Sequence, residues 1–171
     1  NYVYHGFDYK GIIVDETKNL IYEKTSGSEI SIIDGNTNQV LNLLRFHGYI
    51  SSWALDFELN KLYIASSRIN SEEKIYSLNV FDLKNLESIY SFEVSRFKIT
   101  GDEKCSINTT LSVNQNNHRV YFGYSKPYQD YDNINDFIAV IDGNIYQINK
   151  IIYVGNEPTN CVVNENTGFV Y

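Results

Sequence analysis

The chain has 171 residues, of which 43% are hydrophobic and 20% charged, a composition that indicates a folded globular protein rather than a disordered one. It contains no apolar run long enough to cross a membrane as a helix. The net charge of −7, with few and scattered Lys and Arg, argues against nucleic acid and anionic lipid as partners and leaves cations, sugars and other proteins open.

Composition also indicates the type of secondary structure. Asn, Ile and Tyr are abundant, 15% of the residues are aromatic and only 2 are Pro, which suits short strands joined by polar turns. The sequence has no Met and begins at Asn1 without a charged and then apolar leader. We therefore expect a processed or excised segment of a longer protein.

A first sequence unit runs from Gly11 to Thr25 and continues from Glu29 to Leu44. Its short apolar segments are separated by Asn, Asp, Gly and Thr residues that favour turns, which is typical of an antiparallel meander. We predict four strands in this unit, at Ile12–Val14, Leu20–Glu23, Ile30–Asp34 and Val40–Leu44.

The pattern of this unit returns along the chain. The second copy covers Trp53–Ser67 and Ile75–Phe92, the third covers Leu111–Ser125 and Phe137–Val154, and a fourth begins at Cys161. Equivalent tyrosines recur at intervals of roughly 40 to 60 residues, close to the length of a four-stranded propeller blade. They are Tyr22, Tyr63, Tyr121 and Tyr171. Because Tyr171 belongs to an unfinished second strand, we expect the chain to be cut within a blade.

These repeats predict an all-β fold of β-propeller blades, each a four-stranded antiparallel meander. No helix is expected, because apolar residues do not recur at helical spacing over any long window. The chain supplies about three and a third blades of a larger ring, for which we expect six to eight blades. The predicted boundaries are about 11–47, 51–95 and 108–154 for the complete blades and about 159–171 for the start of the fourth.

Two kinds of residue recur at fixed positions and have structural interpretations. Asp34, Asp82 and Asp142 end the third strand of each copy, where an Asp side chain accepts hydrogen bonds from turn amides. The repeated tyrosines of the second strand combine a large apolar ring with a hydroxyl, and we expect them to pack between blades.

Loop lengths predict which face of the propeller binds. The connection between second and third strands grows from Thr25–Ser28 to Ser66–Lys74 and then to Tyr124–Asp136. The connection before the third copy, Ser95–Ile107, is also long and opens on the same face. Long loops on a rigid scaffold are where binding sites usually lie, so we expect the site on that face.

The longest loop carries two sets of candidate ligand-binding residues. Its oxygen-bearing side chains suit Ca²⁺, although their spacing is not that of an EF-hand; they are Asp130, Asp132, Asn135 and Asp136. Its tyrosines, Tyr124, Tyr128 and Tyr131, suit stacking on a sugar or on a partner chain. A third interpretation is a solvated insertion that packs on the neighbouring blade.

Two covalent modifications are also consistent with the sequence. Asn108 begins the single Asn-x-Ser/Thr sequon, on the same face, and is a candidate glycosylation site. Cys105 and Cys161 fall near the boundary of adjacent blades, where they form either one disulfide or two buried thiols.

No catalytic constellation is visible in the sequence. His5, His47 and His118 lie in separate segments without a metal-ligand spacing, and no nucleophile or phosphate-binding motif is present. We therefore predict that the chain is not an enzyme and carries no cofactor, apart from the Ca²⁺ considered above.

Two stretches, Asn19–Leu44 and Ile138–Pro158, resemble the YVTN family of β-propeller repeats. The second copy departs from that pattern, with Asp82-Leu83 in place of Asp-Gly and no Gly-x-x-Pro after its last strand. The resemblance implies an extracellular or cell-surface propeller, of a type frequent in archaeal surface proteins and also found in the bacterial periplasm. The resemblance indicates the fold of the chain but says little about its activity.

These observations favour a non-enzymatic propeller that acts as a structural, adhesive or protein-interaction module, with other protein chains or cell-surface polymers as partners. One alternative is a subunit of a redox or metal-dependent enzyme whose site lies in blades outside this sequence. Another is a carbohydrate-binding propeller that uses the tyrosine-rich loop.

Overall fold

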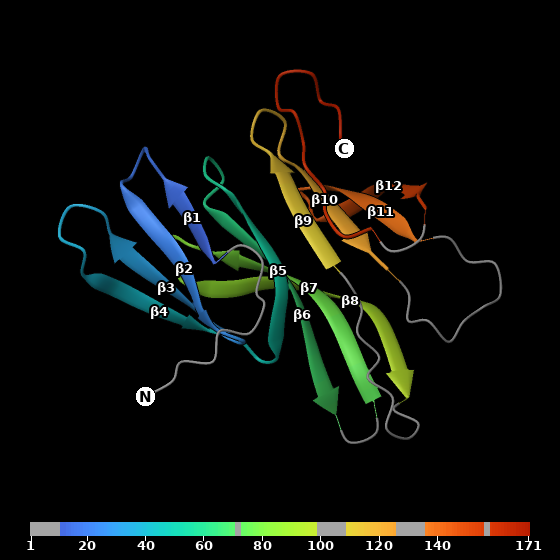
Figure 1. Ribbon diagram of the computed structural model, residues 1–171, viewed down its shortest axis with the longest axis horizontal. Helices are drawn as coiled ribbons and strands as arrows, with labels where there is room; N and C mark the ends of the chain where they lie inside the picture. The colour runs from blue at the N-terminus through green and yellow to red at the C-terminus, as the bar shows by residue number, and fades with distance from the viewer. Residues whose placement is uncertain (1–10, 71–72, 99–108, 126–135, 156–157) are drawn as a thin grey trace. The chain divides into compact units, whose positions relative to one another are not determined.

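The computed structural model describes residues 11–70, 73–98, 109–125, 136–155 and 158–171 (Figure 1). These residues form twelve strands in three four-stranded antiparallel sheets, each built from strands consecutive in the chain. The described residues contain no helix, and therefore none of the length and apolarity that crossing a membrane requires. The chain divides into two compact units, Asn1–Ile50 and Ser51–Tyr171, and each is described by itself.

The first unit contains one sheet with the order β1-β2-β3-β4. Its strands are β1 (Ile12–Asp15), β2 (Leu20–Ser26), β3 (Glu29–Asp34) and β4 (Val40–Arg45). The four strands expected from the sequence are confirmed, although β2 extends further than predicted because Ser26 still pairs with Glu29. Ile30 and Leu44 are buried on one side of this sheet.

The second unit contains two sheets. One consists of β5 (Tyr49–Asp56), β6 (Lys61–Asn70), β7 (Glu73–Asp82) and β8 (Glu87–Lys98). The other consists of β9 (Thr109–Asn114), β10 (Arg119–Tyr124), β11 (Phe137–Asp142) and β12 (Gln147–Tyr153). Beyond β12, Val163 and Val170 form an isolated antiparallel bridge, which is the beginning of the fourth copy.

The connection predicted as a loop at Ser66–Lys74 is largely strand. β6 and β7 continue as a long hairpin in which Arg68 pairs with Ile75 and Asn70 with Glu73. β8 likewise runs to Lys98, into the segment expected to be the loop before the third copy. The polar residues there resemble a turn in composition, but pairing with a neighbouring strand holds them extended. Arg96 reinforces the hairpin by contacting Glu73 and Glu93 at 2.8 Å each.

One turn design recurs seven times in the described chain. An Asp or Asn stands at the end of a strand, or in the last copy after an isolated bridge, and its side-chain oxygen accepts backbone N–H groups two or three residues later at 2.7–3.2 Å. The residue four positions on has a positive φ of 50–73°. The turn-starting residues are Asp15, Asp34, Asp56, Asp82, Asn114, Asp142 and Asn164.

The turn role expected for Asp34, Asp82 and Asp142 is therefore confirmed. Sequence reasoning missed the same turn between the first and second strands, because Asp alternates there with Asn. The left-handed residue is Asn in three of the seven turns, a residue that tolerates this conformation well. The turns fix the relative position of the first and second strands and of the third and fourth strands in each sheet.

A recurrent bulge marks the outer strand of each sheet. Leu41, Ile89 and Asn149 each lack a pairing partner where the register shifts between the third and fourth strands. Each lies seven residues after the Asp that ends the third strand. The extra residue bends the outer strand and increases its twist.

Gly143 occupies a position where a side chain does not fit. Its N–H donates to the His118 carbonyl at 2.8 Å, and a Cβ would lie 2.5 Å from that oxygen and 2.7 Å from the Tyr63 hydroxyl. The equivalent residue of the second sheet is Leu83, so the turn itself accepts a side chain. At Gly143 the close approach of both the His118 carbonyl and the Tyr63 hydroxyl leaves no room for a side chain.

Replacing Gly143 with Ala is expected to lower the free energy of unfolding by about 1–3 kcal/mol, because the new methyl group displaces Tyr63 or the His118 backbone. Urea denaturation of the intact protein measures this. Gly155→Ala is the matched control, since nothing lies within 4 Å of a Cβ there. Equal stability of the two variants would show that the site is not tightly packed.

Acid should weaken the turn at Asp82. The Lys61 ammonium, 2.6 Å away, holds the pKa of this carboxyl below its ordinary value of 3.8, with help from backbone N–H groups. A carboxyl whose pKa is lower in the folded state stabilises the fold at neutral pH, and that stabilisation is lost as pH falls through the folded pKa.

We expect Asp82→Asn to reduce the fall in unfolding free energy between about pH 5 and pH 2. The amide retains an oxygen for the turn N–H groups but no longer attracts Lys61. Denaturation midpoints at a series of pH values test this, with the exposed Glu16→Gln as a charge-matched control. A slope unchanged from the parent protein would contradict the role of the ion pair.

Candidate binding site

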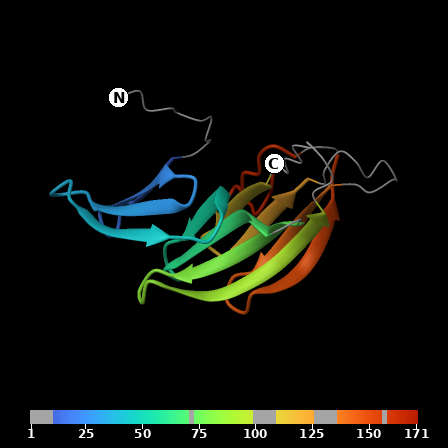
Figure 2. The ribbon, with the colours of Figure 1, turned by 90° about the horizontal axis from the view of Figure 1, so that it is seen from below.

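The site lies where the second and third sheets pack face to face, as Figure 2 shows from below. Strand β6 lies nearest to β9, and side chains of both sheets form one continuous core. Tyr63, fully buried in β6, donates a hydrogen bond to the Gly143 carbonyl of the third sheet at 3.3 Å. Tyr121 packs on Cys161 at the start of the fourth copy in a separate hydrophobic cluster. The expectation that these tyrosines pack between blades is confirmed for Tyr63, and Tyr121 contacts the beginning of the next copy.

Polar contacts fix the two sheets relative to one another. Gln115 accepts the Phe57 N–H at 2.9 Å and donates to the Leu55 carbonyl at 2.7 Å. His118 Nδ1 lies 2.8 Å from a carboxylate oxygen of Asp56, whose side chain is fully buried. These contacts join turns of the two sheets. They therefore fix the position of one sheet relative to the other near β6 and β9.

Replacing Gln115 with Ala should lower the free energy of unfolding by about 1–3 kcal/mol, because a backbone donor and a backbone acceptor lose their partners together. Asn116→Ala is the neighbouring control, since it removes one exposed hydrogen bond to the Glu165 carbonyl. Chemical denaturation of the intact protein measures both. A larger loss for the Asn116 variant would contradict the importance of the Gln115 contacts.

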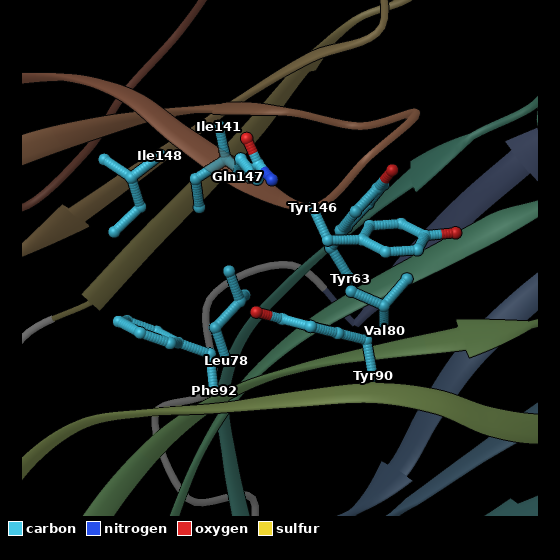
Figure 3. Close-up of a pocket in the computed structure, with 9 residues that line it drawn as sticks. All are labelled: Tyr63, Leu78, Val80, Tyr90, Phe92, Ile141, Tyr146, Gln147 and Ile148. Carbon is cyan, nitrogen blue, oxygen red and sulfur yellow. The ribbon is translucent and has the colours of Figure 1, made fainter.

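A cavity of about 360 Å³ lies between these two sheets, on the side of their fourth strands, β8 and β12 (Figure 3). Strands β6, β7 and β8 form one wall, and β11, β12 and the turn between them form the other. The lining residues are Tyr63, Leu78, Val80, Tyr90 and Phe92 from the second sheet, and Ile141, Tyr146, Gln147 and Ile148 from the third. None of the nine is charged.

Two stacked tyrosines close one end of the cavity. The rings of Tyr90 and Tyr146 lie 5.3 Å apart at 28°, one from each sheet. Tyr146 has a φ of 57°, a conformation that is an outlier for so bulky a residue. The burial of Tyr63 beside them raises the pKa of its hydroxyl, so this group remains a neutral donor to Gly143.

The cavity is buried at its base and open at its rim. Leu78, Val80 and Ile141 are buried, whereas Tyr90, Phe92 and Ile148 are 38%, 38% and 41% exposed. In Figure 3 the Tyr90 hydroxyl points into the space between Phe92 and Ile148. Within the described part of the chain, neither this hydroxyl nor the Gln147 side-chain amide has a hydrogen-bond partner. Both are available to a bound group.

The structure places only some of the site residues predicted from sequence. Tyr124 lies in β10 and is 1% exposed, packed beside Phe122 and Phe137 with ring centroids 6.3 and 5.2 Å away. Its assignment to a surface that stacks on a sugar or partner is therefore wrong, because its ring belongs to the core. Asp136 is also buried, directly before β11.

The other candidates lie outside the described residues, so calcium binding, glycosylation and the disulfide stay predictions. They are Cys105, Asn108, Tyr128, Asp130, Tyr131, Asp132 and Asn135. Cys161, the other half of the predicted disulfide, is fully buried against Tyr121 and Val140. Across the ranges that the structure describes, no three His, Cys, Asp or Glu side chains are grouped to hold a metal ion.

Sequence reasoning did not find the cavity. Its one signal was the exposed aromatic residues of the fourth strand, since Tyr90 and Phe92 alternate with serines as in a half-buried strand. That pattern indicates that another part of the protein covers this face of the strand. It does not reveal that a cavity remains under the cover.

No protein-family model and no curated protein matches the chain. Solved structures do resemble it: U3-55K with a TM-score of 0.59 at 12% identity, the WD40 repeats of RRP9 with 0.58 at 13%, and apo AztD from Citrobacter koseri with 0.57 at 16%. Each similarity covers 88% of this chain.

The fold is therefore that of a β-propeller, and each of the three sheets is a blade. At such low identities the similarity concerns the fold alone. The chain spans 41%, 40% and 36% of the length of these three structures, respectively.

Proposed function

We propose that the chain is part of an extracellular or cell-surface β-propeller that acts as a non-enzymatic protein-interaction module. The observation that carries the proposal is the cavity between the second and third blades, which is uncharged, apolar and open on a rigid junction. Pockets of this kind suit binding by burial of apolar surface rather than proton or electron transfer. The propeller supplies the fixed framework.

The ionisable side chains beside this junction support a non-catalytic role. The carboxylates of Asp56, Asp82 and Asp142 accept hydrogen bonds from their own turns, and His118 bonds to Asp56. These contacts are those of structural groups, since each satisfies a neighbouring backbone or side-chain partner. The resemblance of Ile138–Pro158 to YVTN repeats supports the extracellular or surface location.

The test uses the intact protein in its native cells. A membrane-impermeant lysine-directed crosslinker should couple it to a protein partner, and the purified partner should bind it with micromolar or tighter affinity by calorimetry. Reaction with the impermeant reagent only after cell lysis would contradict the surface location.

Metal analysis and visible absorption of the purified intact protein test the non-enzymatic part. We expect neither a stoichiometric transition metal nor a chromophore. Finding either would instead favour a redox or metal-dependent propeller enzyme. In the crosslinking test, a failure to couple any protein partner would contradict the proposed interaction function.

A further inference from the structure

We propose that the cavity between the second and third blades receives one uncharged aromatic side chain, Trp or Tyr, from the protein partner. The inference rests on the proposed protein-interaction function and names the part of the partner that the surface recognises. It is carried by the lining, size and exposure of the cavity and by the stacked rings of Tyr90 and Tyr146 at its end.

The lining determines the chemistry of the occupant. All nine residues are uncharged, so an inserted Lys, Arg, Asp or Glu would lose its hydration without gaining an ion-pair partner in the lining. Aromatic and aliphatic surfaces line both walls, and an aromatic ring packs well against them. The occupant is therefore apolar and neutral.

The polar groups of the cavity select among aromatic side chains. The Tyr90 hydroxyl faces the cavity and, like the Gln147 amide at its lining, has no hydrogen-bond partner among the described residues. Covering them without a partner costs free energy, whereas an indole N–H or a phenol O–H from the ligand satisfies one of them. Trp and Tyr are therefore favoured over Phe.

The size and openness of the cavity favour a side chain over a free small molecule. A volume of about 360 Å³ lies at the lower end of ligand pockets, which enclose most of a small ligand's surface. Here Tyr90, Phe92 and Ile148 remain more than a third exposed at the rim. A protein that inserts one side chain also covers this rim with its own surface, as at the centre of an interaction hot spot.

The Tyr146 ring forms part of the proposed binding surface, and the positive φ of this residue belongs to the turn that places the ring there. The equivalent turn position is Asn38 in the first blade and Leu86 in the second, with the same positive φ. Asn adopts this conformation readily, but a tyrosine does so at an energetic cost. The Tyr146 ring stacks on Tyr90 and forms the end wall of the cavity.

Saturation-transfer difference NMR on the intact protein tests the occupant directly. The probes are the N-acetyl amides of Trp, Tyr, Phe and Lys. We expect binding of the Trp and Tyr probes, weaker binding of Phe, and none of Lys. Tyr90→Phe removes the cavity hydroxyl and should reduce the preference for Trp over Phe. Binding of the Lys probe as strong as that of Trp would overturn the proposal.

Two substitutions on the same strand locate the binding. Ile148→Trp fills the cavity and should weaken both the Trp probe and the purified partner at least tenfold. Ile152→Trp is the matched control, because Ile152 is similarly exposed, at 37%, but does not line the cavity. It should leave both affinities unchanged. Denaturation midpoints confirm that both variants are folded.

The outcomes separate this inference from the proposed function. If the partner binds the Ile148→Trp variant as tightly as the parent, the cavity is not where it docks, while the interaction function still stands. If the Trp probe binds in the cavity but no protein partner is coupled in cells, the occupant is a free aromatic molecule and both proposals fail. An equal loss from Ile152→Trp would also overturn the assignment to the cavity.

Discussion

A four-stranded sheet presents two broad faces, and without helices to cover them the faces of neighbouring sheets must cover one another. At the junction of the second and third blades the requirement is met tightly near β6 and β9, where Tyr63 and the contacts of Gln115 close the gap. Toward β8 and β12 the same faces leave unfilled space. The buried core and the candidate site therefore lie at opposite ends of the same interface between two sheets.

Much of the fold could be predicted from the sequence because it repeats, and a repeated pattern of apolar segments and turn residues leaves few alternatives. The Asp that ends each third strand was interpretable because its carboxylate has an obvious use in the turn. The equivalent position after each first strand is Asp56 in the second blade but Asn114 in the third. Asn and Asp fulfil the same role through one side-chain oxygen, so a search for identical residues overlooks it.

The parts that sequence did not predict depend on contacts between distant residues. The hairpin beyond Ser66 contains polar residues that also suit a loop, and only pairing across to β7 makes it strand. Tyr124 stood at the edge of a tyrosine-rich loop, yet its ring packs beside Phe122 and Phe137. The cavity exists because the faces of two sheets do not fit together completely. The pattern of residue types along the sequence does not reveal how well two such faces fit.

The bulges at Leu41, Ile89 and Asn149 have a consequence for the behaviour of the molecule in solution. An outer strand exposes a row of unpaired N–H and C=O groups, which is a template for stacking copies into open-ended β-aggregates. The bulge in each fourth strand, seven residues after the Asp that ends the third strand, bends and twists this edge and makes it a poorer template for pairing. The exposed Ile, Tyr and Phe side chains of β8 and β12 can therefore contact a partner without the strand edges pairing with another copy.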